Sequence, residues 1–261
     1  MGLNCSTKRN GDVMIGKKET VSLAWCDNGM VDGKFAEGIA YTLLMGPQHD
    51  VIINNAMRVQ GNQIGRQRQV AFDKWADEIK TDWILWVDSD IYLTVDVMKK
   101  IWQAADKELR PIVSGVYFIS KENEGSVMRP FPCIFKNISE FEIQYIHPLP
   151  KDKVVEVDSA GMGFVLMHKS IVPKLRAKYP NESMFAEKEG LGEEFIGEDI
   201  VFFRKVRAAG IPVYAHTGAL VRHMKRFSLD VDYYALYWNT VAMQEAAVTL
   251  KEEAEKLKPK E

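Results

Sequence analysis

The first half of the chain alternates short apolar runs with longer segments whose apolar residues recur at helical spacing. The apolar runs are rich in β-branched and aromatic residues, which predicts strands at residues 21–26, 51–57, 83–87 and 111–118. The segments between them predict helices at residues 34–44, 63–79 and 94–107. Strands that alternate with helices in this way are typical of a parallel, nucleotide-binding α/β sheet.

The pattern changes after residue 120, where the apolar runs become shorter and more loops intervene. Mixed or antiparallel pairing is expected for strand-like runs at residues 131–135, 142–146, 154–157, 161–167, 211–215 and 219–222. Helices are predicted at residues 169–178, at 198–209 and from about 231 onward, and a polar loop at 180–192. No internal repeat or linker divides the sequence, so we predict a single α/β domain.

Composition narrows the class of protein. The chain has 261 residues, of which 46% are hydrophobic, and a net charge of -2, which gives no support for a nucleic-acid-binding surface. No apolar run reaches the ~18 residues of a membrane-spanning helix, and the polar residues 1–20 lack the apolar segment of a signal peptide. The three cysteines, Cys5, Cys26 and Cys133, show no paired spacing, which is typical of a reducing compartment. We therefore expect a cytoplasmic protein without a transmembrane segment.

Candidate chemistry begins where the apolar run at residues 83–87 meets Asp88-Ser89-Asp90. Residues two apart in an extended segment point the same way, so both carboxylates can face one site at the carboxyl end of the strand. Paired carboxylates suit a Mg²⁺ or Mn²⁺ ion that carries phosphates. The same residues are also typical of a solvated acidic turn in which Asp90 caps the next helix.

An arginine interrupts the apolar stripe of the helix predicted at residues 63–79. Arg68 falls in line with Ala71 and Trp75, whereas Arg66 points roughly the other way. A guanidinium on a buried face requires an anion, which a bound nucleotide would supply. The alternative is that the stem of Arg68 packs while its charged end reaches water.

Three further signals follow along the chain. The glycines of Gly161-Met162-Gly163 permit close approach of a ligand to the backbone, or form a bulge. Glu198-Asp199 opens a helix, where the macrodipole favours carboxylates but where one of them can also act as a general base. His223 follows an alternating segment and is either structural or a third metal ligand beside the aspartates.

The order of these signals is informative: an Asp-x-Asp after a strand, a Gly-x-Gly, a Glu-Asp at a helix start and a late histidine. From about residue 21 to His223, the chain resembles the GT-A glycosyltransferases, especially the inverting, family-2-like group. The resemblance implies the GT-A fold, a Rossmann-like nucleotide-binding mixed sheet flanked by helices. It also implies a nucleotide-sugar-binding half at residues 21–118, an acceptor-binding and catalytic half at 119–230, and a C-terminal helical tail at 231–261.

The resemblance further implies how individual residues act. Asp90 matches the aspartate that binds the divalent cation, Mn²⁺ or Mg²⁺, while Asp88 matches the one nearer the ribose and base. Asp199 matches the catalytic base, with Glu198 beside it on the acceptor side. His223 matches a histidine that joins the metal in some members, so the implied metal set is Asp88, Asp90 and His223.

The donor site follows from the same comparison of motifs. Arg68 matches the arginine of a family Arg-Asn pair, from which Gln69 departs. The loop at Cys26-Asp27-Asn28 departs from the family's Pro-x-Tyr-Asn form, although Asp27 is placed to reach the base. The implied nucleotide-sugar-binding set is Asp27, Arg66, Arg68, Asp88, Ser89, Asp90, Gly161, Met162 and Gly163. Aromatic side chains that could stack on a sugar or pack in the core are Tyr117, Phe118, Tyr237 and Trp238.

These signals predict a metal-dependent glycosyltransferase that moves a sugar from a nucleotide-diphosphate donor to a hydroxyl of a glycan or other acceptor. A UDP-sugar is favoured as donor and a GDP-sugar is possible. Two alternatives stay open. A sugar nucleotidyltransferase shares a similar sheet but usually carries a glycine-rich basic loop after its first strand, where this chain has the acidic Asp27-Asn28-Gly29. The second alternative is a non-catalytic module that binds a nucleotide-sugar.

Overall fold

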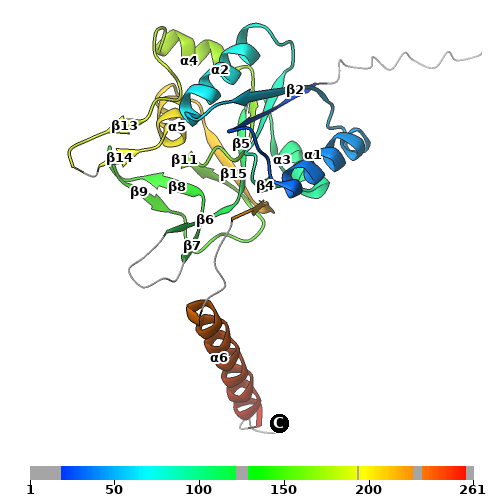
Figure 1. Ribbon diagram of the computed structural model, residues 1–261, viewed down its shortest axis with the longest axis vertical. Helices are drawn as coiled ribbons and strands as arrows, with labels where there is room; N and C mark the ends of the chain where they lie inside the picture. The colour runs from blue at the N-terminus through cyan, green and yellow to red at the C-terminus, as the bar shows by residue number, and fades with distance from the viewer. Residues whose placement is uncertain (1–18, 122–128, 193, 226–230, 257–261) are drawn as a thin grey trace, which may run out of the picture.

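A seven-stranded mixed sheet forms the centre of the protein (Figure 1). The computed structural model describes residues 19–121, 129–192, 194–225 and 231–256. The strands lie in the order β10-β15-β5-β12-β3-β1-β2. Their bounds are Val154–Val157 (β10), Val213–Leu220 (β15), Ile112–Val116 (β5), Phe164–His168 (β12), Trp83–Val87 (β3), Val21–Asp27 (β1) and Ile53–Gln60 (β2).

The direction of the strands places the candidate residues at one edge of the sheet. Strand β1 runs parallel to β2 and β3, and β15 runs parallel to β5. Strand β12 is antiparallel to both β3 and β5, and β10 is antiparallel to β15. Asp27 ends β1 and Asp88 follows β3 directly, so both lie at the carboxyl ends of parallel strands, where ligands bind in open α/β sheets.

Helices cover both faces of the sheet because β3 is apolar on both sides. All five residues of β3 are buried. Ile84 and Trp86 belong to one hydrophobic cluster together with Trp75, whereas Leu85 belongs to a second cluster together with Met98. The helices are α1 (Gly33–Met45), α2 (Ile64–Asp77), α3 (Val95–Ala104), α4 (Ile171–Lys178) and α5 (Glu198–Ala208), with a 3-10 turn η1 at Gly46–His49.

Short strands complete the fold beside the sheet. Strand β8 pairs with β9 and β11, β6 with β7, β13 with β14, and β4 with β16. Their bounds are Ile91–Tyr92 (β4), Phe118–Lys121 (β6), Arg129–Pro132 (β7), Ile134–Asn137 (β8), Ile143–Tyr145 (β9), Ser159–Ala160 (β11), Lys188–Glu189 (β13), Phe195–Ile196 (β14) and Arg222–His223 (β16). Strand β4 begins directly after Asp90. Its pairing with β16 therefore brings the segment that follows β15 beside the Asp-x-Asp.

The structure confirms the predicted mixed α/β domain and corrects two local details. The strands predicted at residues 211–215 and 219–222 form one strand, β15, followed by the short β16. The reason is that alternate residues of β15, from Val213 to Ala219, stay buried along its length. The loop predicted at residues 180–192 contains β13, which pairs with β14.

The helical tail predicted from residue 231 is helix α6, Val231–Lys256, which lies apart from the sheet (Figure 1). Its large apolar side chains are exposed, including Tyr237 and Trp238. Residues 257–261 of the tail lie outside the described residues. Within the described part of the chain, no helix has the length and apolar character required to cross a membrane.

The two described cysteines are free thiols. Cys26 and Cys133 are both buried. Cys5 and residues 1–18 of the polar N-terminal segment lie outside the described residues.

Candidate active site

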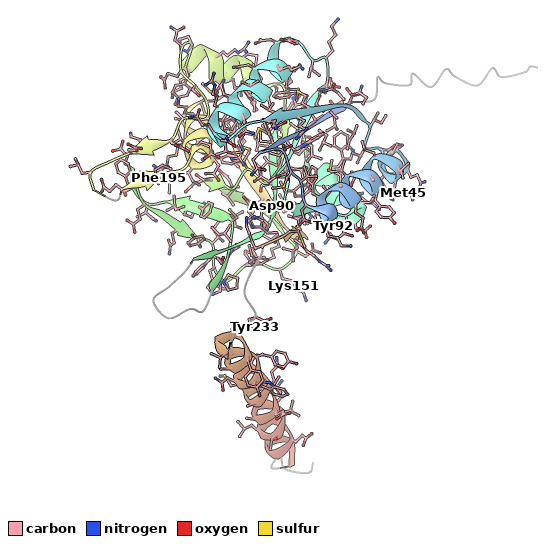
Figure 2. All side chains as sticks on the ribbon, viewed as in Figure 1. Met45, Asp90, Tyr92, Lys151, Phe195 and Tyr233 are labelled. Carbon is pink, nitrogen blue, oxygen red and sulfur yellow. The ribbon has the colours of Figure 1, made fainter. Side chains whose placement is uncertain are left out.

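Asp88 and Asp90 lie in the turn that follows β3, with Asp90 labelled near the middle of the body in Figure 2. The amide of Asp88 donates to the carbonyl of Gly163 at 3.0 Å, and the carbonyl of Asp88 accepts from the amide of Ile91 at 2.9 Å. Ser89 contributes a backbone contact, since its carbonyl accepts from the amide of Asp32 at 2.9 Å. The turn is therefore fixed by the chain on both sides, and its side chains are partly exposed.

Arg68 joins the Asp-x-Asp turn to the start of helix α5. Its Nη2 donates to Asp88 Oδ1 at 2.9 Å and Oδ2 at 3.1 Å, and its Nη1 contacts Glu198 Oε1. The side chain of Arg68 is only 6% exposed. Although burial opposes the charge, Asp88 and Glu198 raise the pKa of Arg68 above its usual value. The anion that the buried arginine requires is therefore present in the protein itself.

Asp199 lies at the first turn of α5, beside this ion network. Its Oδ1 accepts from the amide of Ile200 at 2.8 Å. Burial raises the pKa of Asp199 to about 6, and the negative charges of Glu198 and Asp88 add to that rise while Arg68 opposes it. A carboxylate with a pKa near 6 is a stronger base than an ordinary aspartate and is still ionised at pH 7.

Asp90 is approached from the other side by β16. The pairing sets His223 opposite Ile91, and the amide of Met224 donates to the carbonyl of Asp90 at 2.8 Å. His223 Nε2 lies 3.2 Å from Asp90 Oδ2, and Lys225 Nζ lies 2.7 Å from the same oxygen. Burial tends to raise the pKa of Asp90, but the contacts from His223 and Lys225 prevail and lower it to about 2.

The orientation of His223 suits a cation beside Asp90. Its Nδ1 lies 3.0 Å from the carbonyl oxygen of Phe118, which can only accept, so we assign the proton to Nδ1. Nε2 faces Asp90 Oδ2, where it donates a hydrogen bond if the ring carries a second proton and offers a lone pair to a cation if it does not. An imidazole nitrogen and a carboxylate oxygen are suitable ligands for Mn²⁺. Asp90 and His223 therefore fit the implied ion.

The protein supplies only part of a metal coordination sphere. Within the part of the chain that the structure describes, no group of three or more His, Cys, Asp or Glu side chains comes together to hold a metal. Both oxygens of Asp88 accept from Arg68, so Asp90 and His223 are the members of the expected metal set that are more open to a cation. Any further ligands have to come from water or from phosphate oxygens, as is usual where Mg²⁺ carries a nucleotide.

Gly161 and Gly163 lie against Tyr117 beneath the Asp-x-Asp turn. The amide of Gly163 donates to Tyr117 Oη at 3.3 Å, and a Cβ on Gly163 would lie 3.1 Å from Asp88 Oδ2. The Tyr117 ring also meets the edge of the His223 ring, with 5.1 Å between centroids. Met162 between the glycines is fully buried in the core. Tyr117 is buried too, so it supports the turn from below and offers no open face to a sugar.

Replacing Gly161 with alanine is expected to lower the free energy of unfolding by about 1–3 kcal/mol. The reason is that a Cβ there would overlap Tyr117 Oη and Cys133 Sγ, both buried. Gly33→Ala is the matched control, because its Cβ would meet nothing within 4 Å at the start of α1 and alanine favours the helix. Urea titrations measure both; equal stability of the two variants would contradict the close packing at Gly161.

The carboxylate of Asp27 is occupied by hydrogen bonds from within the protein. Arg58 donates to its carboxylate at 2.6 and 2.7 Å, Gly29 at 2.7 Å and Trp25 at 3.1 Å. These hydrogen bonds, led by that of Arg58, lower the pKa of Asp27. The side chain of Asp27 is fully covered, so a nucleotide would meet Arg58 rather than Asp27.

The other candidates on α2 divide between surface and core. Arg66 is exposed and lines a cavity of about 420 Å³ beside the end of β2, together with Gly61 and Gln67. Gln69, which departs from the family asparagine, accepts through Oε1 from the amide of Met184 at 2.6 Å. This contact ties the segment before α5 to α2. The glutamine therefore has a structural role at the position where the family carries asparagine.

The sequence alone did not indicate three of these contacts. Glu198 was expected on the acceptor side and pairs with Arg68, and neither Arg58 nor Lys225 was singled out. The available signal for Lys225 was its spacing, because residues two apart in an extended segment, such as His223 and Lys225, share a face.

Comparisons with known proteins support the fold. No protein-family model matches the sequence, and no curated protein does. Among solved structures, GalNAc-T7 with UDP, GalNAc and Mn²⁺ is similar at 9% identity with a TM-score of 0.53, over 80% of this chain and 44% of that one. A197 from STIV is similar at 18% identity (TM-score 0.49, 79% of this chain and 86% of that one). CMP:2-keto-3-deoxy-manno-octonic acid synthetase complexed with CTP is similar at 9% identity (0.42, 87% and 99%).

The likeness to GalNAc-T7 defines the class of fold. The chain has a GT-A-like architecture, a single domain whose mixed seven-stranded sheet is flanked by helices. At such low sequence identity, the likeness establishes the fold and leaves the activity to be argued from the site itself.

Proposed function

We propose that the protein is a metal-dependent glycosyltransferase that moves a sugar from a nucleotide-diphosphate donor to an acceptor hydroxyl. The observation that carries this proposal is the bridge from Arg68 to both Asp88 and Glu198. It joins the Asp-x-Asp turn to the start of α5, so that Asp199, a carboxylate with a pKa of about 6, belongs to the same charged cluster as Asp88. A donor site and a base beside it are the two parts that glycosyl transfer requires.

The residues divide the reaction between them. Asp90 and His223 would hold Mn²⁺ or Mg²⁺, whose chemistry is to offset the negative charge on a departing diphosphate. Asp199 takes the proton of the acceptor hydroxyl as its oxygen attacks the anomeric carbon and the bond to the diphosphate breaks. Attack from the side opposite the leaving group inverts the anomeric centre. Glu198, held by Arg68, positions the helix that carries Asp199.

In this scheme, residues 21–118 form the donor-binding half, residues 119–230 the acceptor-binding and catalytic half, and 231–261 the tail. Arg66, Ser89 and the backbone of Gly161-Met162-Gly163 are proposed to complete the nucleotide-sugar site around Arg68, Asp88 and Asp90. Asp27 would act through Arg58, whose guanidinium it holds. A UDP-sugar is the favoured donor and a GDP-sugar the second; the acceptor is a glycan or another hydroxyl compound.

The first loop supports a transferase over a nucleotidyltransferase. The amide of Gly29, which could have bound a phosphate, donates to Asp27 Oδ1 instead. Release of pyrophosphate from an NTP and a sugar phosphate would favour the nucleotidyltransferase.

A thermal-shift panel of UDP-, GDP-, TDP- and CMP-sugars, with and without Mn²⁺, tests the proposal. A ligand at about 100 times its Kd adds about 2.7 kcal/mol to the stability of the folded state. One class of donor is expected to raise Tm in the presence of Mn²⁺. Asp90→Ala should lose the part of that rise that depends on Mn²⁺, whereas Asp152→Ala, at the exposed pair with Lys100, should keep it. No rise with any donor would refute the proposal.

A further inference from the structure

Lys225 contacts the Asp90 oxygen that also faces the metal-ligating nitrogen of His223. Lys225 Nζ lies 2.7 Å and His223 Nε2 lies 3.2 Å from Asp90 Oδ2. The backbone fixes this arrangement, because β16 is paired with β4 and the amide of Met224 donates to the carbonyl of Asp90. His223 on β16 and Lys225, two residues later, therefore both reach toward Asp90.

The mobility and exposure of the two groups differ. The side chain of Lys225 is 54% exposed, whereas that of His223 is 12% exposed and is anchored at Nδ1 by the Phe118 carbonyl. A lysine has a long flexible stem and can turn from one anion to another without disturbing the fold. The neighbouring cation, Arg222, is directed elsewhere, with its guanidinium 5.8 Å from the centre of the Tyr92 ring.

We propose that Lys225 is a built-in competitor of the divalent cation at Asp90, and that it moves to the diphosphate when the donor binds. This inference rests on the proposed function. A divalent ion held by Asp90 and His223 would share the Asp90 carboxylate with the ammonium of Lys225, and two cations on one carboxylate repel each other. A bound diphosphate offers the ammonium another anion within reach of the same turn.

The consequence is coupling between metal and nucleotide. The protein alone binds Mn²⁺ weakly, because the ion has to displace Lys225. The nucleotide diphosphate removes that competition and tightens Mn²⁺ binding, and by reciprocity Mn²⁺ tightens nucleotide binding. Lys225 thus limits metal binding when no donor is bound, so that metal and donor bind together.

Calorimetric titration of the full chain tests this coupling, with UDP and GDP as nucleotide probes. Lys225→Met should bind Mn²⁺ alone up to about fivefold more tightly than the unchanged protein, the range expected for removing one exposed charge pair. It should bind the nucleotide more weakly in the presence of a chelator. The factor by which nucleotide tightens Mn²⁺ binding should therefore fall. Lys174→Met on α4, an exposed lysine remote from Asp90 in sequence, is the control and should match the unchanged protein.

The outcomes separate the two proposals. Equal affinity of Lys225→Met and the unchanged protein for Mn²⁺, with the same gain on adding nucleotide, would overturn the role of Lys225 and leave the transferase proposal standing. Failure of the unchanged protein to bind either nucleotide or any sugar donor, with or without Mn²⁺, would overturn both. Lys225→Met that binds Mn²⁺ more tightly but keeps full nucleotide affinity in chelator would overturn the transfer of Lys225 to the diphosphate.

Discussion

Replacing Arg68 with methionine is expected to lower the free energy of unfolding by about 3–5 kcal/mol, the largest effect of any single substitution proposed for this protein. Methionine fills much of the same space, so the loss is one of charge. Asp88 and Glu198 would be left with no counter-charge from α2, beside a third carboxylate at Asp199. The Glu198 side chain is only 10% exposed, and an unpaired carboxylate with so little access to water strongly destabilises the folded state.

Urea denaturation at pH 7 measures this loss, and a surface pair supplies the control. Arg176 contacts Asp77 through two nitrogens, but their side chains are 44% and 51% exposed. Arg176→Met should therefore cost far less than Arg68→Met, because exposed pairs contribute little. If the two variants unfold at the same urea concentration, the buried bridge is not the feature that joins α5 to the sheet.

A second substitution tests the assigned cause. Adding Glu198→Gln to Arg68→Met removes one of the unpaired negative charges and should recover part of the lost stability. Glu198→Gln alone should be mildly destabilising, since Arg68 keeps Asp88 as a partner. Stabilities that simply add in the double variant would show that Arg68 and Glu198 do not act as a pair.

The strength and limits of the sequence reading are both visible at Arg68. The apolar stripe of α2 indicated that a buried guanidinium would require an anion, and two carboxylates of the protein supply it. The stripe could not say which one, because the partners lie 20 and 130 residues away and meet only when β3 and α5 are in place. The strand itself was predictable, since the five apolar residues before Asp88 are buried on both faces.

The environment of Asp90 shows the same limit at longer range. Lys225 is 135 residues from Asp90, and they meet through a pairing of two-residue strands, β4 and β16. Strands that short leave no readable period in the sequence. Asp27 is a different case: a carboxylate after a strand suggested a ligand contact, but Arg58 on the neighbouring strand β2 already engages both of its oxygens.

Replacing Asp199 with asparagine is expected to lower kcat by about 10²–10⁴ while leaving the affinity for the nucleotide-sugar nearly unchanged. Asparagine keeps the shape of the side chain and an oxygen that can accept from the Ile200 amide. What it loses is the ability to take a proton. Steady-state kinetics with the donor found by the thermal-shift panel measure kcat, and calorimetry measures donor affinity. Turnover at the original rate would indicate a retaining mechanism or a different base.

The dependence on pH gives a sharper test of the same residue. Only ionised Asp199 can accept a proton, and its pKa is about 6, so the activity of the unchanged protein should fall as the pH drops through about 6. Glu198 is one of the negative groups that raise this pKa, so Glu198→Gln should move the acid limb to lower pH. If the fall in activity at low pH occurs at the same pH in Glu198→Gln as in the unchanged protein, a group other than Asp199 is responsible for it.

Stability should change in the opposite direction to activity in Asp199→Asn. A carboxylate whose pKa is raised by folding destabilises the folded state when it is ionised. This destabilisation is complete at pH values above the folded-state pKa of about 6 and absent below the unfolded-state pKa. Asp199→Asn should therefore be more stable than the unchanged protein at pH 8, by about 3 kcal/mol, and this advantage should vanish near pH 4. Urea titrations at the two pH values measure it. A loss of stability at both pH values would mean that Asp199 supports the fold. A gain only at high pH would show that the ionised carboxylate destabilises the folded state. That is the cost expected where a charge is kept for function, as a general base requires.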